Sequence, residues 1–404
     1  MRSYLQSTPG KSEVYGFVGA LLKRHLSLCD FGRSCRVGTL LAVLLFAAAR
    51  RLSTSRAAKV LRGAPSDETV RNALHAQLGS MSQLEDQLNA ALCDRLPRSI
   101  RRGRRVWAID LHQQPYYGKP QKAARELRPG KAKQGTRWFH TVATLYLAHR
   151  GERFTLAMTY VFGDEPLVAV LARLIARVRG KRIFPRYLLL DREFYSVEVV
   201  QFLQSHHLPF LMPVVHHGRR AKDPATAKGT QRFLACRRSC FATHRMQSKD
   251  RTAQVRIAVS VDQQPALKGR FSKRKPSRKR RILVYAFWGF QPSGPAWVRE
   301  EYRRRFGIEA SYRQMREGQA RTTTRRPIVR LLLIGIALLL RNAWVWLHRT
   351  LISRELPHGA LLMHAERLRL ATLLIHLEHE VILLFGLADI PDCTIAGGAT
   401  SYGS

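Results

Sequence analysis

Residues 297–316 read WVREEYRRRFGIEASYRQMR and combine one carboxylate with an aromatic ring and several guanidinium groups. The spacing predicts a single helix on which four side chains share one narrow stripe, namely Tyr302, Arg305, Glu309 and Arg316. Arg313 lies close to that stripe. A carboxylate suits a metal ion, and guanidinium groups suit phosphate. The alternative interpretation is a solvated helix face on which Arg305 pairs with Glu309 four residues later.

The chain is strongly basic, with 69 Lys and Arg against 28 Asp and Glu and a formal net charge of +41. A folded protein tolerates that self-repulsion best when its partner is a polyanion. Nucleic acid is therefore the first expected partner, and an anionic membrane surface is the second. The 404 residues, 45% of them hydrophobic, are enough for two or three domains with real cores.

Cysteine content and apolar runs indicate the compartment. Six cysteines in 404 residues do not form a dense disulfide framework, which fits a reducing cytoplasm. Residues 1–10 lack the apolar core of a secretory signal. The apolar runs 37–49 and 331–340 fall short of the roughly 20 residues that a membrane span needs. We therefore expect buried helices and a cytoplasmic, nucleoid-associated protein without a membrane segment.

Residues 1–100 are expected to be helical and to form a candidate DNA-end-binding domain. A short helix, a turn at Gly63 and a helix capped by Ser66 are compatible with a helix-turn-helix unit. A third amphipathic helix follows, with an apolar face made by Leu84, Leu88 and Leu92. Any helical hairpin produces the same pattern, so DNA contact by this unit stays an open alternative.

After a basic linker at 95–105 the hydrophobic period changes to that of strands. Five apolar runs predict strands, at 106–111, 138–147, 154–161, 187–190 and 209–215. Helices are expected at 167–178, capped by Asp164, and at 197–206. This order predicts a mixed α/β core whose first part is residues 101–215. Asp110 and Asp191 each close an apolar strand, where ligand-binding groups of such sheets gather.

The second half of the chain returns to this core after an interruption. Residues 216–289 are expected to form a β-rich basic insertion with a small core of its own, and its charged loop at 268–281 is a candidate phosphate clamp. Residues 290–350 supply the second part of the core, including an apolar helix at 328–347 packed under the sheet. Residues 351–404 are expected to contain a helix at 361–384 and a disordered tail at 396–404.

Three carboxylates stand out by context: Asp110, Asp191 and Glu309. Two divalent cations held by hard oxygen ligands serve phosphodiester chemistry, one activating the nucleophile and the other stabilising the leaving oxygen. Taken alone, an aspartate at such a position is more often a turn residue or a strand-end cap. In this order and on this strand–helix pattern, the three resemble the catalytic set of a ribonuclease-H-like core.

The chain resembles insertion-sequence transposases of the DDE class that carry a Tyr-Arg-Glu-Lys signature. Tyr302, Arg305 and Glu309 match its spacing, and Arg316 stands where the family prefers lysine, which keeps the charge but alters its geometry. The stretches AIDLHQQPYYG and LLLDREFYS resemble the family's two aspartate motifs around Asp110 and Asp191. Members often have glycine after the Asp-Arg pair, where this chain has Glu193. A β-rich insertion before the glutamate is also a family trait.

The resemblance implies an α/β fold: a ribonuclease-H-like mixed-sheet catalytic core with a β-rich insertion and an N-terminal helical domain. It implies cleavage of double-stranded DNA at element ends, a hairpin intermediate and strand transfer into target DNA by a homodimer on paired ends. Asp110, Asp191 and Glu309 would hold Mg²⁺, with Mn²⁺ as a substitute. The matched Tyr302, Arg305 and Arg316 would contact DNA phosphates, with Arg313 nearby.

The resemblance also implies an aromatic ring that stacks on a flipped base. Phe306 and Trp288 are the candidates, and the alternative for both is a place in the core.

Three alternatives stay open at this point. A catalytically silent, transposase-derived DNA-binding protein would bind DNA without cutting it in Mg²⁺ or Mn²⁺. A structure-specific nuclease on the same core would cut but not join. Cys236, Cys240 and His244 repeat at intervals of four residues, which could mimic a zinc site, although the spacing is not a standard pair and a fourth ligand is not evident.

Overall fold

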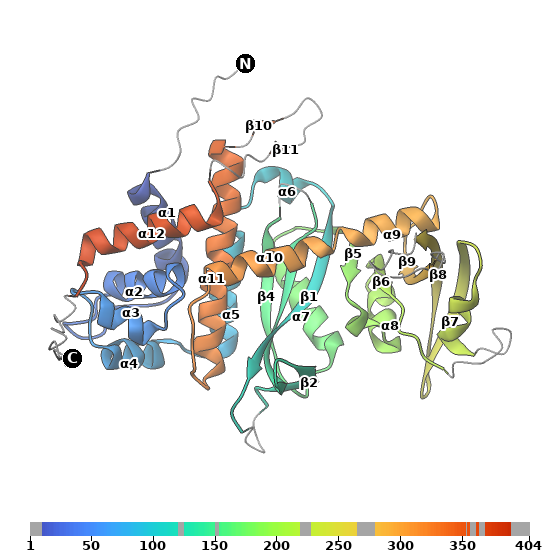
Figure 1. Cartoon of the computed structure of the whole chain (residues 1–404), viewed down its shortest axis with the longest axis horizontal. Coiled ribbons are helices and arrows are strands. Elements are labelled where there is room, and N and C mark those ends of the chain that lie inside the picture. Colours follow the sequence, from blue (N-terminus) through green and yellow to red (C-terminus); the bar gives the residue numbers. More distant parts are fainter. Residues whose placement is uncertain are drawn as a thin grey trace, which may run out of the picture.

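The computed structural model describes residues 10–119, 125–149, 153–218, 228–264, 279–352, 354–355, 361–362 and 368–388. Most helices gather at one end of the molecule, and a long mixed sheet runs from the centre to the other end (Figure 1). The chain therefore has a mixed α/β fold. Its buried apolar residues form one continuous cluster that reaches from the N-terminal helices to the far strands.

The first hundred residues are helical, as the sequence predicts. The elements are α1 (Lys11–His25), α2 (Val37–Ala49), α3 (Thr54–Val60), α4 (Asp67–Gln77), α5 (Met81–Asp94) and α6 (Arg98–Arg102). Ser66 caps α4, because its Oγ accepts the backbone N–H of Thr69 at 3.1 Å. Leu84, Leu88 and Leu92 are buried along α5. The expected linker at 95–105 contains α6 and the first residue of the next strand.

Within the described residues, the central sheet has nine strands. They are β1 (Arg105–Tyr116), β2 (Arg128–Lys133), β3 (Thr136–Leu147), β4 (Thr155–Val161), β5 (Pro185–Leu190), β6 (Phe210–Pro213), β7 (Cys240–Ser248), β8 (Arg251–Gln264) and β9 (Lys279–Trp288). Their order is β2-β3-β1-β5-β6-β9-β8-β7, with β4 on β3. Strand β5 runs parallel to both β1 and β6, and the other pairs in the sheet are antiparallel.

Two helices make the parallel connections, α7 (Leu167–Arg179) before β5 and α8 (Val197–Ser205) after it. The prediction that Asp164 caps the first of them is wrong. The N-cap residue is Pro166, and no side-chain hydrogen bond caps this helix. Asp164 stands two residues upstream, outside the reach of the first turn, and pairs with Arg125 at 3.5 Å instead.

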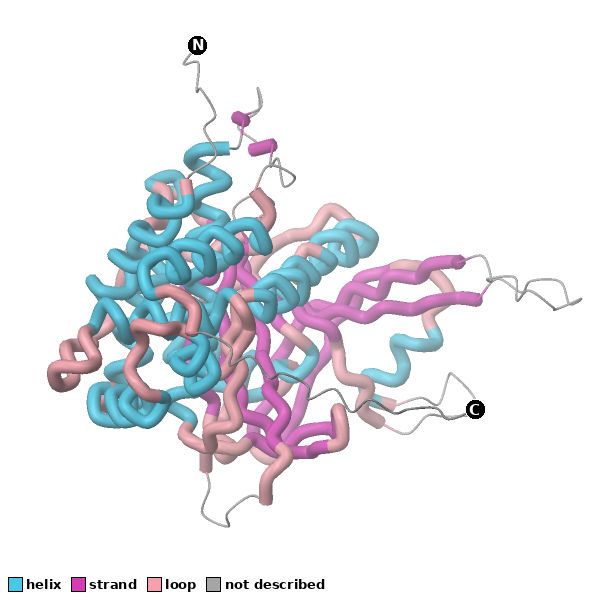
Figure 2. Tube along the Cα trace, turned by 60° about the vertical axis from the view of Figure 1, so that its left-hand side comes forward, coloured by secondary structure: helices cyan, strands magenta, loops and turns pink. Residues whose placement is uncertain are grey.

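The expected insertion is β-rich, and its strands extend the central sheet. β9 pairs antiparallel with β6, so that Trp288 lies opposite Phe210, and β8 and β7 follow outward. The residues that were expected to build a separate small core, such as Ile257 and Phe287, belong to the continuous cluster. In Figure 2 these strands project away from the helices as an arm. Most of the charged loop at 268–281 lies outside the described residues.

The prediction of one helix over 297–316 is wrong. The segment forms two helices, α9 (Pro295–Arg303) and α10 (Phe306–Glu317), joined through Arg304 and Arg305. At the junction four backbone hydrogen bonds tighten to the i→i−3 pattern, among them Arg305 N–H to Tyr302 carbonyl at 3.0 Å and Ile308 N–H to Arg305 carbonyl at 2.8 Å. Tyr302, Arg305 and Glu309 still lie together across the break, because the Arg305 guanidinium lies 5.5 Å from the Tyr302 ring centre and donates to Glu309.

The long apolar helix α11 (Pro327–Leu347) packs against α5, α2, α10 and β4. The expectation that it is too short to span a membrane is wrong. Together with its π-helical extension His348–Ile352, this helix is 26 residues long and has a mean hydropathy of 1.9. By length and composition it is therefore long and apolar enough to cross a membrane. Its strongest window is 94% buried inside the protein, however. The other apolar run, residues 37–49, forms α2, and the chain bends by 108° between α2 and α3.

The last helix, α12 (Leu370–Phe385), packs against α1 and α2, so the chain returns to its N-terminal helices. Here too the expected start at residue 361 is wrong. Leu361–Leu362 forms the short strand β11, which pairs with β10 (Arg354–Glu355). The tail at 396–404, expected to be disordered, lies outside the described residues.

Candidate active site

The parallel pairing of β1 and β5 brings the two aspartates together. Ile109 pairs with Leu190, so Asp110 and Asp191, the next residue of each segment, emerge side by side. Asp191 directly follows β5, as the sequence predicts. Asp110 does not close its strand, because β1 continues to Tyr116 with Asp110 opposite Thr144 of β3. The polar second half of β1 forms a strand because β3 pairs with it along its whole length.

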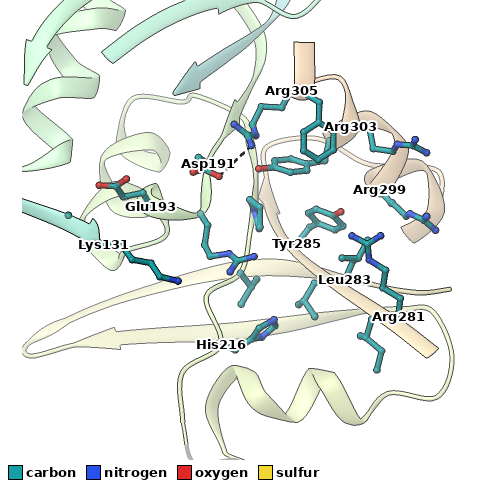
Figure 3. Close-up of a pocket in the computed structure, with 18 of the residues that line it drawn as sticks. Lys131, Asp191, Glu193, His216, Arg281, Leu283, Tyr285, Arg299, Arg303 and Arg305 are labelled. Carbon is teal, nitrogen blue, oxygen red and sulfur yellow. Dashed lines mark ion pairs between the residues drawn. The ribbon is translucent and has the colours of Figure 1, made fainter. Parts of the chain in front are cut away.

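Arg305 lies at the centre of the three predicted carboxylates. Its Nη1 donates to Oδ2 of Asp110 at 3.1 Å, and its Nη2 donates to Oε1 of Glu309 at 3.2 Å. The same Nη2 is 3.6 Å from Oδ1 of Asp191, the ion pair dashed in Figure 3. Arg305 is only 6% exposed. Three carboxylates from two strands and one helix therefore converge on one buried guanidinium.

Burial acts on the pKa of two groups in this cluster, Asp110 and Arg305. It raises the pKa of Asp110 to about 6, against the stabilising charge of Arg305, and the carboxylates of Asp191 and Glu309 add to the rise. Burial alone would lower the pKa of Arg305, but Tyr302 and the three carboxylates outweigh it and raise that pKa. The arginine therefore stays charged and supplies the counter-charge that the carboxylates need.

The donor types in this cluster fit a hard divalent cation, because three carboxylates converge on a single positive group. Their present spacing is set by the larger guanidinium. Among the described residues, no group of three or more His, Cys, Asp or Glu side chains is arranged closely enough to hold a metal ion. Asp110, Asp191 and Glu309 could close around Mg²⁺ only if Arg305 withdrew from between them.

Two tyrosines fix the helices against the strands. Tyr302 is 5% exposed, and its hydroxyl donates to the Leu190 carbonyl at 3.2 Å. Tyr312 was missed by the sequence reasoning. Its hydroxyl donates to the Asp110 carbonyl at 3.1 Å and shares a 2.6 Å hydrogen bond with Oγ1 of Thr144. The sequence did contain a signal for it: Tyr312 follows Glu309 by three residues and Arg305 by seven, a spacing that places residues on the same face of a helix.

A cavity of about 1130 Å³ opens beside the cluster and is walled by Asp191, Tyr302, Arg305 and Phe306. Six cationic residues also line it, namely Lys131, Lys133, Arg192, Arg281, Arg299 and Arg303, together with Glu193 and a set of apolar side chains. Figure 3 shows Lys131, Arg281, Arg299 and Arg303 around this cavity. Phe306 is 49% exposed and meets the Tyr302 ring edge to face. The cavity thus combines Asp191 of the carboxylate cluster, three aromatic rings (Tyr285, Tyr302 and Phe306) and a basic wall.

The other predicted residues lie in different places. Trp288 is partly buried, packs on the core at the end of β9 and lines neither large cavity. Arg313 is exposed on α10. Arg316 is also exposed and lines a second cavity together with the buried His112. None of these three residues lines the cavity beside the carboxylate cluster.

The structure also shows where the cysteine–histidine motif on β7 and the residue after the Asp-Arg pair lie. Cys240 and His244 are four residues apart on β7, which places them about 13 Å apart along the strand. They cannot share a metal ion, so this motif is not a zinc site. Glu193, which stands where glycine was expected, lies in a 3-10 turn at Arg192–Phe194 and accepts a hydrogen bond from Arg128 at 3.3 Å.

Comparison with known proteins supports the fold. No family model and no curated protein matches the chain. Among solved structures, a piggyBac transposase in a synaptic complex with hairpin DNA is similar over 94% of this chain and 80% of its own, with a TM-score of 0.51 and 11% sequence identity. At this identity the similarity is one of fold. The chain has a transposase-like mixed α/β fold.

Proposed function

We propose that this protein is the DNA transposase of an insertion sequence, built on a ribonuclease-H-like core. One observation carries the proposal: Asp110, Asp191 and Glu309, far apart in the sequence, meet on one buried guanidinium at the edge of a basic cavity. Carboxylates on a rigid sheet next to a phosphate-binding wall are the parts that phosphodiester cleavage requires. The transposase-like fold supports the same reading.

In this proposal the three carboxylates hold Mg²⁺, with Mn²⁺ as a substitute, once Arg305 exchanges them for a DNA phosphate. When bound, the metal ions activate the attacking oxygen and neutralise charge on the leaving one. Tyr302 anchors α9 to the end of β5 and so keeps Arg305 within reach of both the carboxylates and a DNA phosphate. The basic wall orients the DNA backbone, and Phe306, exposed in the cavity, is the ring placed to stack on an unpaired base.

The finer parts of the proposal follow the family resemblance. Hydrolysis at each element end frees a 3′-hydroxyl, which attacks the opposite strand to give a hairpin and, after reopening, attacks target DNA. The N-terminal helices bind the element ends, and two copies of the chain act on paired ends. The solved neighbour was captured in a synaptic complex with hairpin DNA, which is consistent with such a route.

The central test replaces each carboxylate by its amide. Asp110→Asn, Asp191→Asn and Glu309→Gln should each abolish end cleavage in Mg²⁺ and Mn²⁺ while DNA binding stays close to wild type. Glu317→Gln, an exposed change on the same helix, is the matched control and should cleave normally. The substrate is the DNA that flanks the gene, which the proposal expects to carry terminal inverted repeats. Wild-type cutting by any amide variant would remove that residue from the metal site.

A catalytically silent DNA-binding protein is the second candidate, and the Arg305 contacts favour it, because they satisfy the carboxylates without a metal. Binding without cleavage by the wild-type protein in either metal would support it. A nuclease that cuts but never joins would give no strand-transfer product from a labelled 3′ end.

A further inference from the structure

A second cavity, of about 890 Å³, lies beside the polar half of β1 and has no acidic side chain among the described residues that line it. Five cationic residues from distant parts of the chain line it, and we call them the Arg330 groove: Arg51, Lys133, Arg316, Arg321 and Arg330. In a chain of this charge, a basic surface is expected almost anywhere. The groove therefore needs a feature that points specifically to a bound anion.

Arg330 is that feature. The side chain is 92% enclosed, being only 8% exposed. Its Nε donates to the Thr324 carbonyl at 2.7 Å, but among the described residues the guanidinium has no ion pair and no further hydrogen bond. Burial lowers its pKa. A buried cation without a counter-ion is strongly destabilising, so an arginine held this way is best explained by an anion that enters the groove.

The other cations are fixed around the groove by the backbone. The N–H of Arg321 donates to the Leu52 carbonyl at 2.9 Å, which ties the segment between α10 and α11 to the turn that carries Arg51. Arg51 adopts a left-handed backbone conformation, with φ of 54°. Over the described residues, Arg51, Arg316 and Arg321 form no ion pair with a carboxylate. Their charges are therefore available to a ligand.

The Arg330 groove adjoins the first cavity, the one beside the carboxylate cluster, because Gln113 and Lys133 line both cavities. We propose that the Arg330 groove binds the phosphate backbone of the DNA strand that runs on from the scissile phosphate. A chain of phosphates fits better than a single anion, because the cations come from three parts of the chain around the cavity and Lys133 also lines the basic wall of the first cavity. Identifying the strand as substrate DNA rests on the proposed function; binding by the groove does not.

The test measures binding of a fluorescein-labelled 40-base-pair duplex and of its single strand, in EDTA, over a series of salt concentrations. Arg51→Asn/Arg321→Ala removes two exposed groove charges, and asparagine tolerates the left-handed backbone at position 51. The matched control, Lys181→Ala/Arg182→Asn, removes two exposed charges outside both cavities, and Arg182 has a similar φ of 58°. A plot of the logarithm of the DNA-binding constant against the logarithm of the salt concentration has a negative slope. We expect that slope to become shallower by about two in the groove variant only.

Arg330 itself is tested through stability as well as binding. Arg330→Met removes the buried charge and keeps an apolar stem, so we expect a higher Tm without DNA and at least about fivefold weaker DNA binding. An arginine with a merely structural role would instead lower Tm on replacement and leave the salt slope unchanged.

Three outcomes would overturn the proposal. The first is the same salt slope in the groove variant and the matched control. The second is a lower Tm for Arg330→Met with wild-type DNA binding. The third is saturable binding of pyrophosphate or ATP that the groove variant loses while its DNA slope stays normal, which would assign the groove to a small anion. All measurements are made without metal, so loss of cleavage in the carboxylate variants neither supports nor weakens this result.

Discussion

Nη1 of Arg305 lies 3.1 Å from Oδ2 of Asp110, although 195 residues separate the two in sequence. The contact joins the break between α9 and α10 to the middle of β1. Because Arg305 also reaches Asp191 and Glu309, one cation both neutralises the carboxylate cluster and sets its spacing. Metal binding and the release of Arg305 are therefore expected to be coupled.

Arg305→Gln should expose that coupling. Without the guanidinium, Asp110 is left buried beside two other carboxylates, and we expect the free energy of unfolding in EDTA to fall by about 3 kcal/mol. Mn²⁺ should then raise the Tm of the variant more than that of the wild type, because the metal replaces the lost counter-charge. Thermal melts with and without Mn²⁺ measure both effects.

The neighbouring arginine provides the control for this experiment. Arg304 pairs with Glu301 outside the carboxylate cluster. Arg304→Gln should lower Tm without changing the response to Mn²⁺. Equal Mn²⁺-induced shifts in Arg305→Gln and the wild type would contradict the coupling.

Gly307→Ala should disturb the junction of α9 and α10. A Cβ at this position would lie 2.8 Å from the Tyr146 hydroxyl and 3.2 Å from Cζ of Arg153, so one of the neighbours must move. We expect a loss of about 1–3 kcal/mol in the free energy of unfolding. Tyr146→Phe removes the closest atom and should recover much of that loss in the double variant. Urea unfolding of the four proteins gives the coupling, and additive losses would show that Gly307 does not depend on this contact.

The parts of the site that were predictable from sequence are those set by local pattern. Asp191 follows a short run of buried apolar residues whose end is visible in the sequence, and the Ser66 cap depends on a hydroxyl three residues before its partner. The relation between Arg305 and Glu309 was visible as an i,i+4 pair, and the structure adds that both belong to the carboxylate cluster. Such features need only a few consecutive residues.

The features that were mispredicted or missed depend on distant partners. Asp110 lies within a strand because β3 pairs with the polar half of β1, and the hydrophobic periodicity of the local sequence does not reveal that pairing. The break at Arg304 and Arg305 occurs where α10 must approach Tyr146, which sequence spacing does not reveal. Trp288 looked like a candidate for the site, but its pairing opposite Phe210 places it at the edge of the core.

Asn342 should be essential to the joint between the N-terminal helices and the sheet. Its Oδ1 accepts the Thr155 N–H at 2.9 Å, and its Nδ2 donates to the carbonyls of Leu92 and Thr155. Asn342→Leu keeps the volume but leaves buried backbone groups unpaired, and we expect a loss of about 2–4 kcal/mol. Asn72→Leu, at an exposed position of α4, should change stability by less than about 0.5 kcal/mol.

The same variant reports on whether the helices fold independently. Since the core is continuous, urea transitions followed by circular dichroism and by tryptophan fluorescence should coincide in the wild type and shift together in Asn342→Leu. A separate transition of the helical signal would show that the N-terminal helices are an independent folding unit.

His140 should make the protein sensitive to mild acid. It is 1% exposed, and burial lowers its pKa to about 4, with a further contribution from Arg330 of α11. The Tyr160 hydroxyl donates to the Glu126 carbonyl at 2.6 Å, so it accepts from Nδ1 of His140, and Nε2 has no partner in the described structure. The Tyr116 ring of β1 covers the other side. A proton on Nε2 would therefore be a buried, unpaired charge next to a cation.

The sign of the pH dependence follows from the lowered pKa. The folded state favours neutral His140, so its contribution is complete above the unfolded pKa of about 6.5 and is lost as the pH falls from there towards 4. A shift of this size amounts to roughly 3 kcal/mol. His140→Gln can still donate to Tyr160 and does not titrate, so its stability should fall less between pH 7 and 4.5. Buried His112, with its pKa lowered to about 3, titrates in both proteins and cancels in the difference. Urea unfolding across this range decides the matter, and parallel curves for the two proteins would exclude His140 as the source of acid sensitivity.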